Sequence, residues 1–197
     1  HLFPKSLELF PLKATTCHSY CTYCHRWMPL IDVDERFVYS DNNEVTEYLS
    51  SHPEIEEVIF SGGDPMTMST NNIKKVIDPL IDNGIVKTVR IISKSLAWWP
   101  YRYITDQDSE ELLSYFKHLF EKGIHITILA HFTHPKELET EIVKKAIQRI
   151  LATGTVIRCQ GPIVRNINDK AETLSELWNR QVQLGMIPYY LFVEFNY

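Results

Sequence analysis

The stretch Thr15–Trp27 reads TTCHSYCTYCHRW and places Cys17, Cys21 and Cys24 within eight residues. The only other cysteine, Cys159, lies far downstream. Thiolates are soft ligands that suit zinc or iron–sulfur clusters, and the C-x3-C-x2-C spacing gathers three of them on one loop. The stretch therefore predicts a metal-binding loop, and the sequence around it indicates which fold carries that loop.

Composition restricts the class of protein. The chain has 197 residues, of which 44% are hydrophobic and 23% charged, and this is typical of one globular domain spanning residues 1–197. A net charge of −5 without a basic stripe argues against a nucleic-acid partner. No apolar run approaches the ~18 residues of a membrane span. Three adjacent cysteines and one distant one do not resemble a secreted disulfide scaffold, so we expect a cytoplasmic protein.

Short β-rich runs alternate with helical patterns along the chain. The β-rich runs lie at residues 7–14, 57–60, 86–93, 125–132, 155–160 and 188–194, and the helical patterns at 43–51, 70–83, 108–122, 136–153 and 170–184. The last four helical patterns end at a glycine, as helix C-caps do: Gly84, Gly123, Gly154 and Gly185. The repetition predicts right-handed βα units around a parallel sheet, either an open doubly wound sheet or a partial barrel.

The unusual residues follow the predicted strands. Ligands gather at the carboxyl ends of parallel strands in both candidate folds. The cysteine loop follows the first strand, and the turn Ser61-Gly62-Gly63-Asp64-Pro65 follows the second. Lys94, His131 and Gln160 fall at the ends of the next three strands. We therefore expect all of these residues on one rim of the sheet.

The residues alone leave three interpretations of the cysteines open. A structural zinc site needs four ligands, which His18 and His25 could complete. A [4Fe–4S] cluster usually takes four thiolates, so three would leave one iron open to another ligand. The third interpretation is that the cysteines are incidental buried residues.

Several motifs resemble the lysine 2,3-aminomutase family of the radical S-adenosylmethionine (SAM) superfamily. They are CTYCHRW, FSGGDP, AHFTHPKELE, PIVRNINDKAETLSEL and PYYLF, in this order, and the resemblance extends over roughly Leu9–Phe192. It implies a partial (β/α)6 barrel of the TIM type. It also implies that Cys17, Cys21 and Cys24 bind three irons of a [4Fe–4S] cluster while SAM binds the fourth.

The resemblance implies a reaction as well. The reduced cluster would cleave SAM to a 5′-deoxyadenosyl radical, and this radical would take a hydrogen atom from a small, amino-acid-like substrate during a 2,3-aminomutase-like isomerisation. The electron would come from a donor such as flavodoxin or ferredoxin. The implied metal ligands are the three cysteines of the loop.

The resemblance also assigns roles to single residues. Arg26 would bind the substrate carboxylate. The implied SAM contacts are Tyr23 toward the adenine, Gly62, Gly63 and Asp64 toward the amino group, Lys94 toward the carboxylate, and His131 and Gln160 nearby, with Gln160 near the sugar. Each residue also has a structural interpretation: a turn, core packing, a solvated lysine or an ion pair that steadies the loop.

The chain departs from the family toward its end. Phe195 stands where the aminomutases carry an aspartate for the distal ammonium of lysine, and Trp98-Trp99 replace an aliphatic stretch. The family anchors pyridoxal phosphate on a lysine near its C-terminus, but the last lysine here is Lys170, so the anchoring lysine is absent from this chain and use of that cofactor is undecided. Because the chain begins at His1 and ends at Tyr197, we expect either a fragment or a shortened relative. A radical SAM enzyme without pyridoxal phosphate and a zinc-binding structural module remain alternatives.

Overall fold

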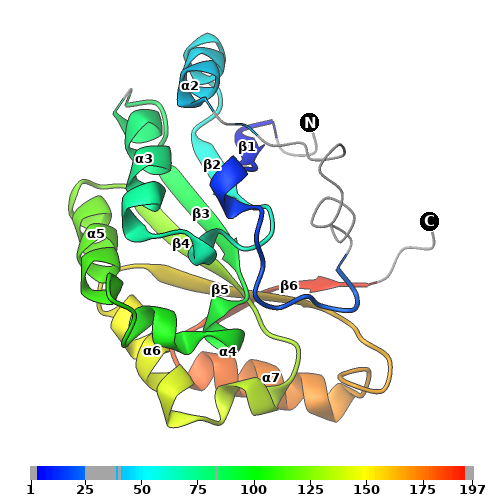
Figure 1. Cartoon of the computed structure of the whole chain (residues 1–197). Coiled ribbons are helices and arrows are strands. Elements are labelled where there is room, and N and C mark those ends of the chain that lie inside the picture. The colour runs from blue at the N-terminus through cyan, green and yellow to red at the C-terminus, as the bar shows by residue number, and fades with distance from the viewer. Residues whose placement is uncertain (1–3, 25–38, 40, 83, 194–197) are drawn as a thin grey trace.

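Six parallel strands form one open sheet. The computed structural model describes residues 4–24, 39, 41–82 and 84–193. The strands pair in chain order and all in parallel: β1 (Ser6–Leu9), β2 (Glu57–Phe60), β3 (Thr88–Ser93), β4 (His125–His131), β5 (Val156–Pro162) and β6 (Ile187–Phe192). Figure 1 shows α3, α5, α6 and α7 along one side of the curved sheet. This confirms the predicted partial (β/α)6 barrel.

Helices connect the strands. They are α2 (Asn42–Ser51), α3 (Thr70–Ile81), α4 (Ser95–Trp98), α5 (Ser109–Glu121), α6 (Glu141–Leu151) and α7 (Ala171–Gln183). The described residues also form short 3-10 turns: η1 (Leu12–Ala14), η2 (Pro65–Thr67), η3 (Pro100–Tyr103) and η4 (Pro135–Leu138). The four predicted glycine caps all have positive φ, between 73° and 86°. Glycine adopts this conformation without the strain a Cβ would add, so each helix can turn back into the sheet.

The structure differs most from the predictions in three segments. The first strand ends at Leu9 instead of residue 14, because the chain leaves the sheet before Pro11 and forms η1. The predicted helix at 136–153 begins only at Glu141, since a separately capped 3-10 turn precedes it. The turns α4 and η3 were not predicted at all, because Pro100 interrupts any helical period there.

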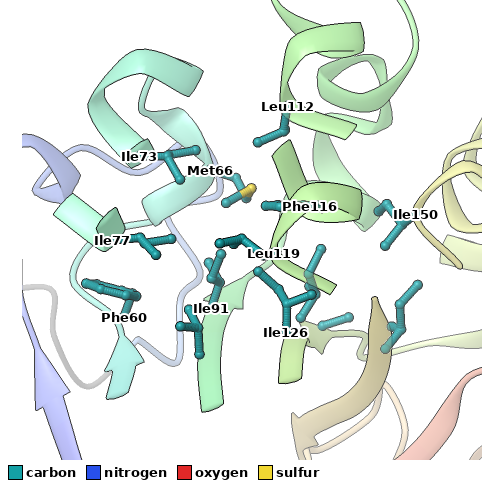
Figure 2. Packing of buried hydrophobic residues seen from close by; sticks show 14 of the residues in the cluster. Phe60, Met66, Ile73, Ile77, Ile91, Leu112, Phe116, Leu119, Ile126 and Ile150 are labelled. Carbon is teal, nitrogen blue, oxygen red and sulfur yellow. The ribbon is translucent and has the colours of Figure 1, made fainter. Parts of the chain in front are cut away.

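The core lies between the sheet and its helices. Ile91 and Ile126 from the strands lie beside Leu119 of α5, and Phe60 lies beside Ile77 of α3 (Figure 2). Because side chains alternate along a strand, every second residue of β2, β3 and β5 is buried in this core. The residues between them, which are half buried except for the buried Gln160, face the opposite side of the sheet, which we call the inner face.

A buried arginine ties the segment after α4 to the start of α3. Arg102 is 4% exposed, and its guanidinium donates to Asp108 Oδ1 at 2.6 Å and to the carbonyl oxygens of Met66 and Met68 at 3.1 Å. Asp108 also accepts from the backbone N–H and the hydroxyl of Thr70 at 2.6 and 2.7 Å. Asp108 therefore joins α3 to the segment before α5.

We expect Asp108→Asn to lower the free energy of unfolding near pH 7 and to make it less sensitive to acid. Burial raises the pKa of Asp108, but the hydrogen bonds from Thr70 and Arg102 lower it by more than burial raises it. The pKa therefore falls from 3.8 to about 2. Because the folded pKa lies below the unfolded one, the carboxylate stabilises the fold fully above about pH 4. That contribution, about 2 kcal/mol, is lost as the pH falls through about 2.

Urea unfolding from about pH 7 to about pH 2 measures this effect. The difference in unfolding free energy between wild type and Asp108→Asn should shrink in acid, whereas Asp169→Asn, at an exposed position, should keep a constant difference. A difference for Asp108→Asn that is independent of pH would contradict the assignment.

Candidate functional site

The turn after β2 holds the cysteine loop in place through backbone hydrogen bonds. Ser61 N–H donates to Leu9 O at 3.0 Å, and Gly63 N–H donates to Ala14 O at 2.8 Å. Asp64 N–H donates to Thr16 O at 2.8 Å, immediately before the first cysteine. The two features that the sequence predicted on one rim are therefore in direct contact.

Both glycines of this turn are required by that contact. A Cβ on Gly62, whose φ is +134°, would lie 2.8 Å from Ala14 O, and a Cβ on Gly63 would lie 2.3 Å from Thr16 O. These obstacles are backbone atoms, which cannot move aside as a flexible side chain can. The glycine pair thus lets the cysteine loop approach the end of β2 closely.

Asp64 connects three segments at the rim. It is 2% exposed and accepts from Met66 N–H at 3.0 Å, from Ser93 Oγ at 2.8 Å and from Lys94 N–H at 2.8 Å. His18 Nε2, from the cysteine loop, lies 3.5 Å from Asp64 Oδ2. Burial raises the pKa of Asp64, and His18 and the hydrogen bonds from Lys94 and Ser93 oppose that rise. The carboxylate therefore fixes the end of β3 and the cysteine loop to the same turn.

The three cysteines of the loop are free and half buried. The loop is tightly turned, since Cys24 N–H donates to Cys21 O at 3.0 Å and Tyr20 has a φ of 44°. Burial raises the pKa of Cys21, Lys94 and Tyr23 lower it, and the charges of Cys17 and Cys24 raise it, so the thiols lie within electrostatic reach of one another. Within residues 4–24, 39, 41–82 and 84–193, no three His, Cys, Asp or Glu side chains are placed to hold a metal ion.

Polar side chains at the ends of β3 and β4 and in η4 form a largely buried cluster with Tyr23 of the cysteine loop. We call it the rim cluster: Tyr23, Lys94, His131, Thr133 and Glu137. Lys94 is 6% exposed, and its Nζ lies 3.0 Å from Thr133 Oγ1, 3.1 Å from Glu137 Oε1 and 3.3 Å from Tyr23 Oη. Lys94 is therefore not a solvated lysine at a strand end.

Tyr23 joins the cysteine loop to this cluster. Its hydroxyl lies 2.8 Å from Thr133 Oγ1 and 3.2 Å from His131 Nε2, and its ring stacks on His131 with centroids 5.6 Å apart. Burial, and then the Lys94 charge, lower the pKa of His131 to about 3, so the imidazole is neutral near pH 7. The charges of the cluster are therefore those of Lys94 and Glu137.

The other predicted site residues have different outcomes. Gln160 is 9% exposed and lies opposite His131 in the register of β4 and β5, so the two belong to the same rim. Arg26 and His25 lie outside the described residues, as does Phe195. The role of Arg26 thus stays a prediction.

Three residues of the site were given no role from the sequence. They are Ser93, Glu137 and Thr133, whose hydroxyl lies against Lys94 Nζ. Glu137 had a readable signal, because His134-Pro135-Lys136-Glu137 has the spacing of a capping box. His134 Nδ1 accepts from Lys136 N–H at 3.2 Å, and Glu137 Oε2 accepts from the N–H groups of Thr133 and His134 at 2.5 and 3.2 Å.

The chain is similar in sequence to curated lysine aminomutases. A putative L-lysine 2,3-aminomutase of Aquifex aeolicus (strain VF5) is 36% identical over 199 residues, which cover 98% of this chain and 50% of the relative. The L-lysine 2,3-aminomutase of Escherichia coli (strain K12) is 29% identical over 90% of this chain and 49% of its own length. That of Clostridium subterminale is 27% identical over 98% of this chain and 43% of its own length. The chain thus spans about half the length of these relatives, and no family model matches it.

Solved structures share the fold. The Streptococcus suis protein SuiB bound to S-adenosylmethionine superposes with a TM-score of 0.59 at 14% identity, over 97% of this chain and 39% of that chain. The protein anSMEcpe with bound AdoMet and the Kp18Cys peptide gives a TM-score of 0.60 at 12% identity, over 95% of this chain and 51% of that chain. Among the described residues, no helix is both long and apolar enough to cross a membrane.

Proposed function

We propose that this chain, which is a lysine 2,3-aminomutase-like chain of the radical SAM superfamily, binds a [4Fe–4S] cluster and SAM and cleaves SAM reductively. One observation carries the proposal: the C-x3-C-x2-C loop is bound by its backbone to the Gly-Gly-Asp turn at the carboxyl ends of parallel strands. This is the rim where α/β folds of this kind collect their ligands.

The residues of the loop suit a cluster. Cys17, Cys21 and Cys24 offer three free thiols of the soft kind that iron–sulfur clusters require. Burial raises the pKa of Cys21, and the Lys94 charge opposes that rise, which limits the loss of the thiolate form that binds metal. Each cysteine of such a site binds a different iron, so the thiols need not converge on one point as they do around zinc. When bound, the cluster supplies the electron that breaks a carbon–sulfur bond of SAM.

The rim residues would orient SAM. We assign the backbone of Gly62 and Gly63 to its amino group, Lys94 to its carboxylate, Tyr23 to its adenine, and His131 and Gln160 to the neighbouring sugar. A SAM carboxylate would have to replace one of the present contacts of Lys94, and Glu137 is the charged group it would compete with. A lysine binds a carboxylate as a point charge, although it lacks the two-pronged geometry of arginine.

The finer reaction is also a proposal. We propose a 2,3-aminomutase-like isomerisation of an amino-acid-like substrate whose carboxylate binds Arg26, with an electron from a donor such as flavodoxin or ferredoxin in the cytoplasm. No lysine follows Lys170 in this chain, and a radical SAM reaction without pyridoxal phosphate is the second candidate.

Anaerobic purification tests the proposal. We expect a brown protein with about four irons per chain and visible absorbance that bleaches with dithionite. With SAM and dithionite, it should form 5′-deoxyadenosine, which chromatography with mass detection measures. A colourless protein with one zinc per chain would instead establish the structural-module alternative.

A further inference from the structure

The inner face of the sheet carries a second charged group below the rim. Arg90 on β3 and Arg158 on β5 occupy half-buried positions that alternate with core residues. Both strands flank β4, where Arg90 pairs in register with Thr127 and Arg158 with Leu129. Arg158 lies two residues before Gln160 on the same strand, so the two side chains share a face. The arginines thus lie inside the partial barrel, beneath the proposed SAM site.

A β-bulge brings the two arginines to one aromatic ring. Cys159 pairs with Pro188 and Gln160 pairs with Tyr190, which leaves Tyr189 as the extra residue of β6. Bulges re-aim side chains in this way. The guanidinium carbons of Arg158 and Arg90 lie 4.8 and 6.0 Å from the centroid of the Tyr189 ring. Two cations therefore share one small region of the inner face.

The described residues leave this region with excess positive charge. Arg90 Nη2 forms an ion pair with Glu57 Oε1 at 2.7 Å. In the part of the chain that the structure describes, no carboxylate lies within ion-pair distance of Arg158, and the buried Nε of Arg90 has no hydrogen-bond partner. Burial, and then the charges of Arg158 and Arg90, lower the pKa of His125 nearby, and the charge of Glu57 opposes that shift. A half-buried guanidinium without an anion is costly, so an anion bound beside Arg158 would stabilise this part of the inner face.

We propose that Arg158, together with Arg90, binds an anionic oxygen group of the substrate, either a carboxylate or a phosphate. The inference rests on the proposed function, because the substrate of such an enzyme would lie inside the barrel below SAM. A guanidinium fork matches both groups in geometry and charge. The substrate would therefore be an amino-acid-like molecule whose far end is acidic, and the far ammonium of lysine would be repelled at this position.

Calorimetric titration of the whole chain, without SAM, tests this proposal and separates the two anions. Glutarate is the carboxylate probe and inorganic phosphate the phosphate probe; we expect at least one of them to bind. Arg158→Leu should weaken that binding about 10- to 100-fold, since a hydrogen-bonded charge contact is lost. Arg158→Lys, which keeps the charge and loses the fork, should weaken it less. Lys145→Leu, which removes the same charge from an exposed position on α6, should leave it unchanged.

Each outcome supports or overturns the inference. Binding of neither probe, or equal binding by wild type and a folded Arg158→Leu, overturns it, and so does an equal loss in Lys145→Leu. If circular dichroism shows that Arg158→Leu does not fold, Arg158→Lys tests the proposal instead. Unchanged anion affinity in Arg158→Lys would exclude binding by the guanidinium fork of Arg158. Formation of 5′-deoxyadenosine is measured on the same preparation. If glutarate binds but no 5′-deoxyadenosine forms, the proposed function is overturned, whereas the anion site at Arg158 is supported.

Discussion

Cys21→Ala is expected to lower 5′-deoxyadenosine formation from SAM at least about 100-fold, because it removes a cluster ligand. Even the loss of a residue that only supports a metal ligand lowers metal affinity or activity about 10- to 100-fold. Burial raises the pKa of Cys21, and the neighbouring Lys94, Tyr23, Cys17 and Cys24 shift it as well. Its loss should also lower the iron content of the protein after anaerobic reconstitution. The same result is expected for Cys17→Ala and Cys24→Ala.

Cys159→Ala is the matched control for the loop cysteines. Cys159 is 2% exposed on β5, and its Sγ lies 3.9 Å from Met186 Sδ in the core. Burial raises the pKa of this thiol, so it behaves as a small apolar side chain and not as a ligand. Iron content and 5′-deoxyadenosine per folded chain should stay near wild type, although a core cavity can cost about 1 kcal/mol of stability.

The two variants together identify what the loop does. Undiminished 5′-deoxyadenosine in Cys21→Ala would contradict the cluster assignment. An equal loss of iron in Cys159→Ala would indicate that thiol deletion acts through folding. Thermal unfolding of both variants, followed by circular dichroism, separates folding from metal binding.

Local chemistry explains what could be predicted from the sequence. The strand at Glu57–Phe60 was predicted with its observed bounds, because a short β-branched run meets a Gly-Gly turn there. The glycine caps were confirmed for the same reason, since a positive φ depends on one residue and its immediate neighbours. The resemblance to lysine 2,3-aminomutases, stated from five short motifs, was confirmed by relatives that match over almost the whole chain.

The rim cluster could not be predicted in full, because it depends on pairing across the sheet. Lys94 and Glu137 are far apart in sequence, and their ion pair forms only because β3 and β4 are neighbours. The positions of Arg90 and Arg158 inside the barrel could not be predicted from the sequence either. An arginine that alternates with apolar residues in a strand indicates a solvent-facing side, and only the curvature of the sheet turns that side into the interior of a barrel.

Asp64→Ala is expected to lower the free energy of unfolding by about 3–5 kcal/mol, which urea denaturation can measure. The substitution leaves the donors on Met66, Ser93 and Lys94 without their acceptor in a buried site. Each unpaired buried donor costs about 1–3 kcal/mol, and these costs overlap because the donors can partly rearrange. Asp64 also faces His18, so its loss should loosen the cysteine loop and speed the reaction of Cys17 with a thiol reagent.

Asp41→Ala provides a graded comparison for Asp64→Ala. Asp41 is exposed and caps α2 through one hydrogen bond, from Asn43 N–H at 2.8 Å, so its removal should cost only about 1 kcal/mol and leave the thiols unaffected. Asp64→Asn should fall between the two, because an amide keeps the shape and one acceptor but turns its NH2 group toward a donor. If Asp64→Ala costs no more than Asp41→Ala, the carboxylate does not hold the turn, β3 and the cysteine loop together. The rigidity of the rim would then rest on the backbone hydrogen bonds of residues 61–64 and on the close approach at Gly62 and Gly63, where a Cβ has no room.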